Sequence, residues 1–237
     1  MVLASSPPVL VWDSFATPSE CASLLEGDWQ SCEVYETVAS RLGTLMKAEP
    51  HVHEERRRFL LTPQDNIPDH LHVDTNNGKL ATFATAILYL TTVDEGAGGH
   101  TCLPLADSSD DDPCLAAAQL LGSANIHHAL GAVTEEETRA AELLAIAATD
   151  CTKGKRGVKV RPVQGKLLLF YGRKSNGEID HRSWHRGDAL LGEYNKRTCK
   201  GICPMLKEVP LEHLASSRTF TEAVASYLKH AQTWLQV

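Results

Sequence analysis

The chain has 237 residues, of which 43% are hydrophobic and 22% charged, and its formal net charge is −7 at pH 7. A chain of this length can bury a substantial core in one large domain or two small ones. The mildly acidic balance argues against non-specific binding to nucleic acid or to anionic membranes as the main activity.

The sequence also argues against export and membrane insertion. No apolar run reaches the ~18 residues needed to span a bilayer, and the start of the chain has neither the charged nor the apolar part of a secretory signal. The seven cysteines are scattered and odd in number, which disfavours a disulfide framework or a structural zinc site. We therefore expect a cytoplasmic protein.

The N-terminal region predicts a strand followed by two helices. Pro8–Trp12 is a short apolar strand candidate. Thr17 as N-cap and Glu20 as the third helical residue make a capping box for a helix that ends at Gly27. A second helix is predicted over 36–47 from its apolar spacing. We expect these helices to be scaffold.

The middle of the chain predicts strands around a His-Val-Asp triplet at 72–74. A strand candidate at 57–61 is followed by a turn-rich segment at 62–69. After a polar turn at 76–79, Leu80–Leu90 is apolar on both faces and predicts a strand buried within a sheet, although its alanines leave a helix possible. A short strand is expected at 100–104.

Residues 105–156 differ from their surroundings. An acidic loop at 107–113 precedes helical stretches at 115–121 and 134–148, and Thr134 with Glu137 makes a second capping box. Helices inserted into a strand-rich chain indicate an excursion from the core fold, of a kind that often serves as a lid or a substrate-selecting element.

The last part returns to strands and ends in a helix. Strands are predicted at 158–162, 166–171 and 196–203, and an amphipathic helix at 219–235. The pattern predicts a mainly β, α+β fold: a jelly-roll, or double-stranded β-helix, braced by helices. We expect one domain over 1–237, with scaffold helices in 1–55, a jelly-roll core in 56–204 interrupted by the helical insertion 105–156, and a helical tail in 205–237.

The triplet His72-Val73-Asp74 is the leading candidate for chemistry. Residues two apart in a strand point to the same face, so His72 and Asp74 can reach one metal ion. A second imidazole from elsewhere in the chain completes the facial triad of non-haem Fe(II) oxygenases, which leaves positions open for substrate and O₂. His185 is the preferred third ligand, and His181, in the same short segment, is its rival.

Several motifs in order around the triplet resemble those of the Fe(II)/2-oxoglutarate oxygenases, specifically the prolyl 4-hydroxylase group. Leu80–Leu90 is similar to the family's R-x-A-T-x-L-x-Y-L strand, and 93–104 to its v-d-e-G-G-x-T-x-F-P segment. Residues 160–170 are similar to v-x-P-x-x-G-x-x-l-x-F, and 183–187 to the s-l-H-x-G segment that carries the distal ligand. The resemblance runs from about Pro68 to Ile202.

The resemblance implies a role for each candidate residue. His72, Asp74 and His185 would hold Fe(II), with 2-oxoglutarate and O₂ as co-substrates and ascorbate as the reductant. Lys196 would bind the far carboxylate of 2-oxoglutarate, with Thr101 as its hydroxyl partner. Arg197 is the alternative to Lys196, because adjacent strand residues face opposite ways and a shift of one residue exchanges them.

The implied reaction is hydroxylation of an unactivated C–H bond, most directly prolyl 4-hydroxylation of a peptide or protein. Some positions depart from the family pattern: residues 64–70 lack the usual tyrosine and glycine, Leu80 replaces an arginine, and Leu103 replaces a phenylalanine. These departures affect walls around the substrate rather than the metal. The alternatives are a free amino acid or another small metabolite as substrate and, from a different class, a binding module without turnover.

Overall fold

A computed structural model describes residues 1–26, 33–46, 57–61, 71–74, 84–122, 134–191 and 196–200, with backbone only for 57–61 and 196–200. The predicted turns at 62–69 and 76–79 and the predicted helix at 219–235 lie outside these residues, as do positions 80–83 and 201–203 of two predicted strands.

The described strands form two antiparallel sheets, so the fold is α+β, as predicted. The six-stranded sheet has the order β1 (Val2–Ser5), β2 (Pro8–Trp12), β7 (Leu167–Tyr171), β4 (Ala84–Tyr89), β9 (Lys196–Lys200) and β3 (Arg57–Leu61). The three-stranded sheet has the order β6 (Val158–Val160), β5 (Thr101–Leu103) and β8 (Arg186–Gly187). Strand β1, which pairs with β2, and the two-residue strand β8 are the described strands without a counterpart in the sequence prediction.

The two sheets share a hydrophobic core. Ile87, Tyr89, Leu168 and Phe170 of the larger sheet join Leu103 of the smaller one in a single buried cluster. Packing of two sheets through their inner faces is the usual way for antiparallel strands to bury one side. Alternate residues of β4 therefore face this interior, and the residues between them face the other way.

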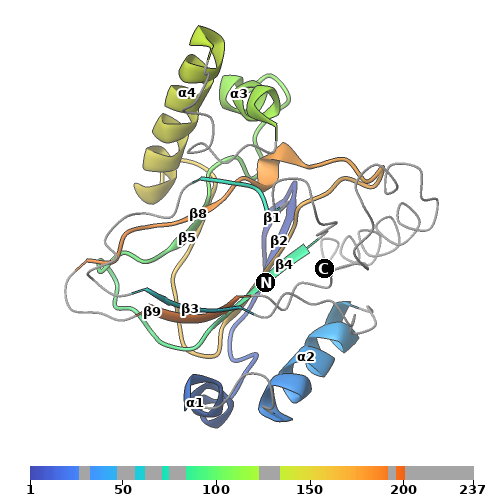
Figure 1. Cartoon of the computed structure of the whole chain (residues 1–237), viewed down its shortest axis with the longest axis vertical. Helices are drawn as coiled ribbons and strands as arrows, with labels where there is room; N and C mark the ends of the chain where they lie inside the picture. Colours follow the sequence, from blue (N-terminus) through green and yellow to red (C-terminus); the bar gives the residue numbers. More distant parts are fainter. Residues whose placement is uncertain are drawn as a thin grey trace.

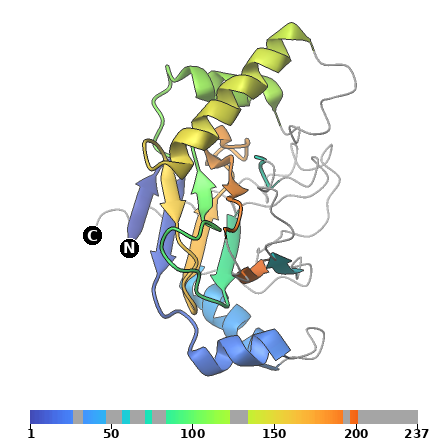
Figure 2. The same cartoon turned by 90° about the vertical axis from the view of Figure 1, so that its left-hand side faces the viewer.

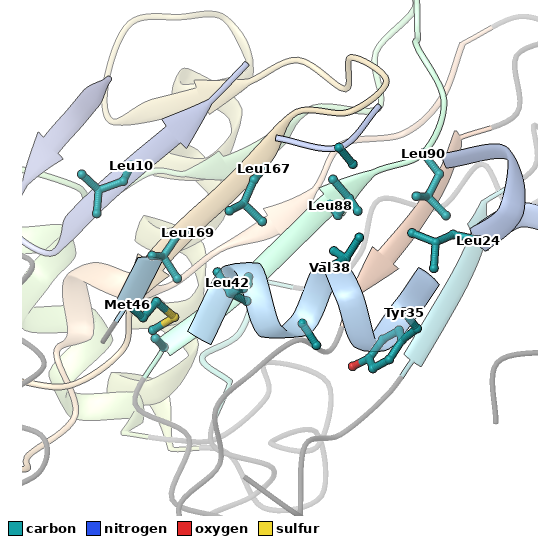
Figure 3. Packing of buried hydrophobic residues seen from close by; sticks show 14 of the residues in the cluster. Leu10, Leu24, Tyr35, Val38, Leu42, Met46, Leu88, Leu90, Leu167 and Leu169 are labelled. Carbon is teal, nitrogen blue, oxygen red and sulfur yellow. The ribbon is translucent and has the colours of Figure 1, made fainter. Parts of the chain in front are cut away.

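Two N-terminal helices cover the outer face of the six-stranded sheet. Helix α1 (Pro18–Glu26) begins at the predicted capping box, in which the backbone N–H of Thr17 donates to Glu20 Oε2 at 2.8 Å. Helix α2 (Glu33–Met46) begins three residues before the predicted start and lays its buried side on β4, β7 and β2. Figure 3 shows the labelled side chains of α2 meeting leucines of these strands.

The helical insertion lies at the opposite end of the molecule from α1 and α2 (Figures 1 and 2). Helix α3 (Pro113–Leu121) is capped by Asp112, whose side chain accepts from the N–H of Cys114. Helix α4 (Glu135–Thr152) begins with the predicted Thr134–Glu137 capping box and continues past the predicted end at 148. The two helices pack on each other and on segments near the candidate site. The buried sides of both helices therefore pack in a hydrophobic cluster with these segments.

None of the described helices is long and apolar enough to cross a membrane.

Candidate metal centre

The backbone brings His72 and His185 directly opposite each other. The N–H of His72 donates to the carbonyl of His185 at 3.0 Å, and the N–H of His185 donates to the carbonyl of His72 at 2.8 Å. Residues paired in this way in an antiparallel bridge carry their side chains on the same side. Two residues that are far apart in the sequence therefore present their imidazole rings together, with ring centroids 4.4 Å apart.

Asp74 completes a cluster with both histidines. Its Oδ1 lies 3.3 Å from His72 Nε2, and its Oδ2 lies 3.4 Å from His185 Nε2. One ligand atom from each of the three residues lies within 4.8 Å of the other two, and this is the one such group of His, Cys, Asp or Glu among the residues described. The sequence-predicted ligands are thus brought together in space.

Two hydrogen bonds orient the ligand atoms. His185 Nδ1 lies 3.1 Å from the carbonyl oxygen of Ser183, and because a carbonyl can only accept, Nδ1 carries the proton and Nε2 presents its lone pair to the cluster. The hydroxyl of Thr85 donates to Asp74 Oδ2 at 2.6 Å. Bonds of this kind behind metal ligands fix ring orientation and carboxylate position.

The cluster is closed on one side and open on the other. The His185 side chain is 3% exposed and meets the ring of Phe170 edge-on, with centroids 4.6 Å apart. The side chains of His72 and Asp74 are 24% and 22% exposed. One side is therefore packed against the inter-sheet core, while solvent reaches the other.

His181, the rival to His185, lies elsewhere. It belongs to the short 3-10 helix η4 (His181–Ser183), and its Nδ1 accepts a long hydrogen bond of 3.5 Å from Trp184 Nε1. Burial lowers the pKa of the His181 imidazole. Its ring is engaged with Trp184, outside the His-Asp-His cluster.

Thr101 sits in a buried hydroxyl pair with Tyr89. The Tyr89 hydroxyl and Thr101 Oγ1 lie 2.7 Å apart, between β4 and β5, and burial raises the pKa of the Tyr89 phenol. Thr85 and Tyr89 belong to the same alternate set of β4, so they share the inner face at a spacing of about 13 Å between Cα atoms. The hydroxyl pair and the metal-ligand cluster thus lie along one strand.

Lys196 begins β9, and its side chain lies outside what the structure describes. Its backbone is paired with Leu61, and the same strand pairs Thr198 with Tyr89 and Cys199 with Leu88. The predicted strand is confirmed for 196–200.

Sequence reasoning did not single out Thr85 and Tyr89. Both stand in the apolar strand that was matched to the family motif, and a hydroxyl on the buried face of such a strand needs a hydrogen-bond partner. That requirement is the signal that points to them. It does not identify the partners, which are Asp74 for Thr85 and Thr101 for Tyr89.

Comparison with solved structures finds proteins of similar shape. A viral collagen prolyl hydroxylase of Paramecium Bursaria Chlorella virus-1, solved as a 2OG complex, has a TM-score of 0.48 and 13% identity, covering 84% of this chain and 97% of that one. A prolyl-4-hydroxylase of Pseudomonas putida has a TM-score of 0.47 and 12% identity, covering 83% and 88%. HygX of Streptomyces hygroscopicus, with nickel and 2-oxoglutarate bound, has a TM-score of 0.45 and 13% identity, covering 83% and 82%.

No protein-family model matches the chain, and no curated protein matches it either.

Proposed function

We propose that this chain is an Fe(II)- and 2-oxoglutarate-dependent oxygenase whose iron is held by His72, Asp74 and His185. The observation that carries the proposal is the convergence of two imidazoles on the two oxygens of one carboxylate, at 3.3 and 3.4 Å. A cluster with solvent access on one side leaves room for further ligands. Two histidines and one carboxylate with open positions are the donor set of non-haem Fe(II) oxygenases.

The two contacts of Asp74 with the histidines are longer than those of a simple ion pair. An imidazole that donates to a carboxylate lies at about 2.7–2.9 Å from it, so both contacts are longer than a good charge-assisted hydrogen bond. Ligands about 2.1 Å from one ion and at right angles to each other lie about 3 Å apart, and one ligand atom from each of the three residues lies within 4.8 Å of the others, so small side-chain shifts would bring them onto one ion. The His185 tautomer, with Nε2 unprotonated, is the one that a metal requires.

The residues around the three proposed ligands then each have a role in the reaction. Bound Fe(II), with 2-oxoglutarate and O₂, supplies oxidative decarboxylation to succinate and CO₂ coupled to hydroxylation of a C–H bond. Ser183 holds the proton of His185 at Nδ1, Thr85 holds the Asp74 carboxylate, and Phe170 excludes water behind His185.

The Tyr89–Thr101 pair and Lys196 are proposed to bind the far carboxylate of 2-oxoglutarate. A buried hydroxyl pair offers donors to an anion, and a lysine supplies its counter-charge. The strand register supports Lys196 over Arg197. In β9, Lys196 alternates with Thr198, and Thr198 pairs with Tyr89, which belongs to the core between the two sheets. Arg197 alternates with Cys199, and Cys199 pairs with Leu88, which belongs to the face of the sheet that the helices cover.

We further propose that the two sheets are the halves of a double-stranded β-helix within a single domain over 1–237, and that the substrate is a prolyl residue of a peptide or protein. The motif matches at 80–104 and 160–187 support the prolyl hydroxylase group. A free amino acid or another small metabolite as substrate is the other outcome of the turnover test described below.

Metal binding tests the site directly. Mn(II), a redox-inert stand-in for Fe(II), is titrated calorimetrically into the wild-type protein and into Asp74→Ala. We expect one site in the wild type and loss of binding in Asp74→Ala, whereas Glu142→Ala, which removes an exposed carboxylate of α4, binds as the wild type does. Equal binding by Asp74→Ala would overturn the site assignment.

Turnover tests the reaction. The protein with Fe(II), ascorbate, O₂ and 2-oxoglutarate is expected to form succinate, and to form it faster with the right substrate. A panel of proline-containing peptides, free amino acids and small metabolites is scanned for products that are one oxygen atom heavier. A hydroxylated peptide supports the prolyl assignment, and a hydroxylated metabolite alone replaces it. Absence of succinate under every condition would refute the oxygenase proposal.

A further inference from the structure

The helices of the insertion build a hydrophobic core together with the two segments that carry the proposed metal ligands. One buried cluster contains Leu71 and Val73 from the first segment and Trp184 from the second. Its other buried members are Leu105, Cys114, Ala117, Ala118, Leu121, Ala140, Leu144, Ala147 and Ala148, of which all but Leu105 come from α3 and α4. In both views the segment 71–74 runs on the α3–α4 side of the molecule (Figures 1 and 2).

The first ligand segment has two faces with different partners. His72 and Asp74 point into the metal-ligand cluster, while Leu71 and Val73 are 5% and 6% exposed and pack against the insertion. Residues of an extended chain alternate between two faces, so whatever positions Leu71 and Val73 also positions the ligands between and beside them.

The second ligand segment is attached to α4 through groups on both sides of His185. Trp184, which precedes it, is fully buried in the cluster with α3 and α4. Arg186, which follows it, donates from Nη2 to Thr152 Oγ1 at 2.9 Å and to the carbonyl oxygen of Ala148 at 3.4 Å. These two hydrogen bonds tie the last turns of α4 to this segment.

Among the described residues, the two ligand segments meet at one bridge, and the second segment continues into β8, which pairs with β5. His72 and His185 are joined by an isolated bridge outside the named strands, and β8, which begins right after His185, has two residues. A single bridge does not hold a pair of chains firmly, because hydrogen bonds in a sheet reinforce one another only when several follow in register. Packing on α3 and α4 adds a constraint on where the ligands sit.

We propose that the α3–α4 pair is a positioning element for the metal centre, with Leu144 as a principal contact. This inference rests on the proposed function, since it assumes that His72, Asp74 and His185 bind a metal. Leu144 is fully buried on α4 in the cluster that holds Val73 and Trp184. Shortening its side chain lets the two ligand segments shift against each other, which lowers metal affinity more than a loss of stability alone explains.

The test compares matched leucines on two helices. Leu144→Ala on α4 is set beside Leu42→Ala on α2, because both leucines are buried at 0–1% exposure but Leu42 packs in the cluster on the far face of the six-stranded sheet. Mn(II) affinity is measured by calorimetry at a temperature where each variant is folded by circular dichroism. Leu144→Ala is expected to raise the Kd for Mn(II) about 10-fold, similar to the effect of changing residues that support metal ligands. Leu42→Ala is expected to keep the wild-type Kd, although the melting temperature of this variant also falls.

Milder variants keep the test informative if an alanine variant does not fold. Leu144→Val and Leu42→Val remove one methylene each and are compared in the same way, and Leu144→Met, which conserves volume, is expected to restore the wild-type Kd. If both helices affect the Kd equally, or neither does, the positioning role is overturned while the metal site stands. If the wild type binds no Mn(II), the metal site itself fails, and with it this role.

Discussion

The hydrogen bond from Thr85 to Asp74 allows a sharp test of how the fold supports the proposed metal ligands. Thr85 is 2% exposed in the central strand β4, and its hydroxyl lies 2.6 Å from Asp74 Oδ2. Thr85→Val replaces the hydroxyl by a methyl group of nearly the same size. The substitution therefore removes one donor without opening a cavity, and β-branched valine suits a strand as well as threonine does.

The expected magnitude follows from the charge on the acceptor. A hydrogen bond to a charged group contributes about 1.5–3 kcal/mol, and loss of an outer-shell partner typically weakens metal binding by 10–100-fold, or about 1.4–2.7 kcal/mol. We expect the Kd of Thr85→Val for Mn(II) to rise by about 10-fold or more. Without metal its stability is expected to change less, because the Asp74 side chain is 22% exposed and water can replace the lost donor.

Calorimetric titration with Mn(II) and urea unfolding without metal separate the two effects. Thr85→Ser, which keeps the hydroxyl and loses the methyl group, is the control and is expected to bind Mn(II) close to the wild-type Kd. If Thr85→Val binds as tightly as the wild type, the hydroxyl does not position Asp74 for a metal, and the reasoning is wrong.

Three further substitutions test the surrounding scaffold by urea unfolding. The Arg41 guanidinium lowers the pKa of Glu20 from its ordinary value of 4.5 to about 2. The stabilisation from this ion pair is therefore present above pH 4.5 and is lost as the pH falls toward 2. Glu20→Gln is expected to cost about 1 kcal/mol at pH 7 and to make stability decline less between pH 4.5 and 2. A Cβ at Gly165 would lie 2.3 Å from the carbonyl oxygen of Ala16, whereas one at Gly154 meets nothing within 4 Å, and both have positive φ; Gly165→Ala should therefore destabilise clearly more than Gly154→Ala, and equal losses would refute the clash. Thr134→Ala removes the capping box of α4 at a cost of about 1 kcal/mol, and Thr134→Ser is expected to retain most of it.

Much of the secondary structure followed from local signals. Both predicted capping boxes form, because a threonine and a glutamate three residues apart satisfy each other's backbone within a single turn. The helix boundaries moved where the signal was weak, at the start of α2 and the end of α4. Leu80–Leu90 predicts a buried strand but allows a helix, and 84–89 form a strand because β7 and β9 flank it on both sides.

For the candidate site, too, the sequence determined the local arrangement and the tertiary structure determined the rest. By itself, the sequence determined which groups stand within reach of one another locally: His72 and Asp74 on one face of an extended segment, and the family-like segment around His185. These are properties of side-chain chemistry and strand periodicity.

Only the tertiary structure decided that His72 and His185 form a bridge, that Thr85 holds Asp74, and that Leu71, Val73 and Trp184 dock on α3 and α4. Each of these contacts joins residues that no local pattern links, because it depends on how the sheets and helices pack. The sequence could thus name His72, Asp74 and His185 as candidates, but only the fold shows that they lie together and which side chains support them.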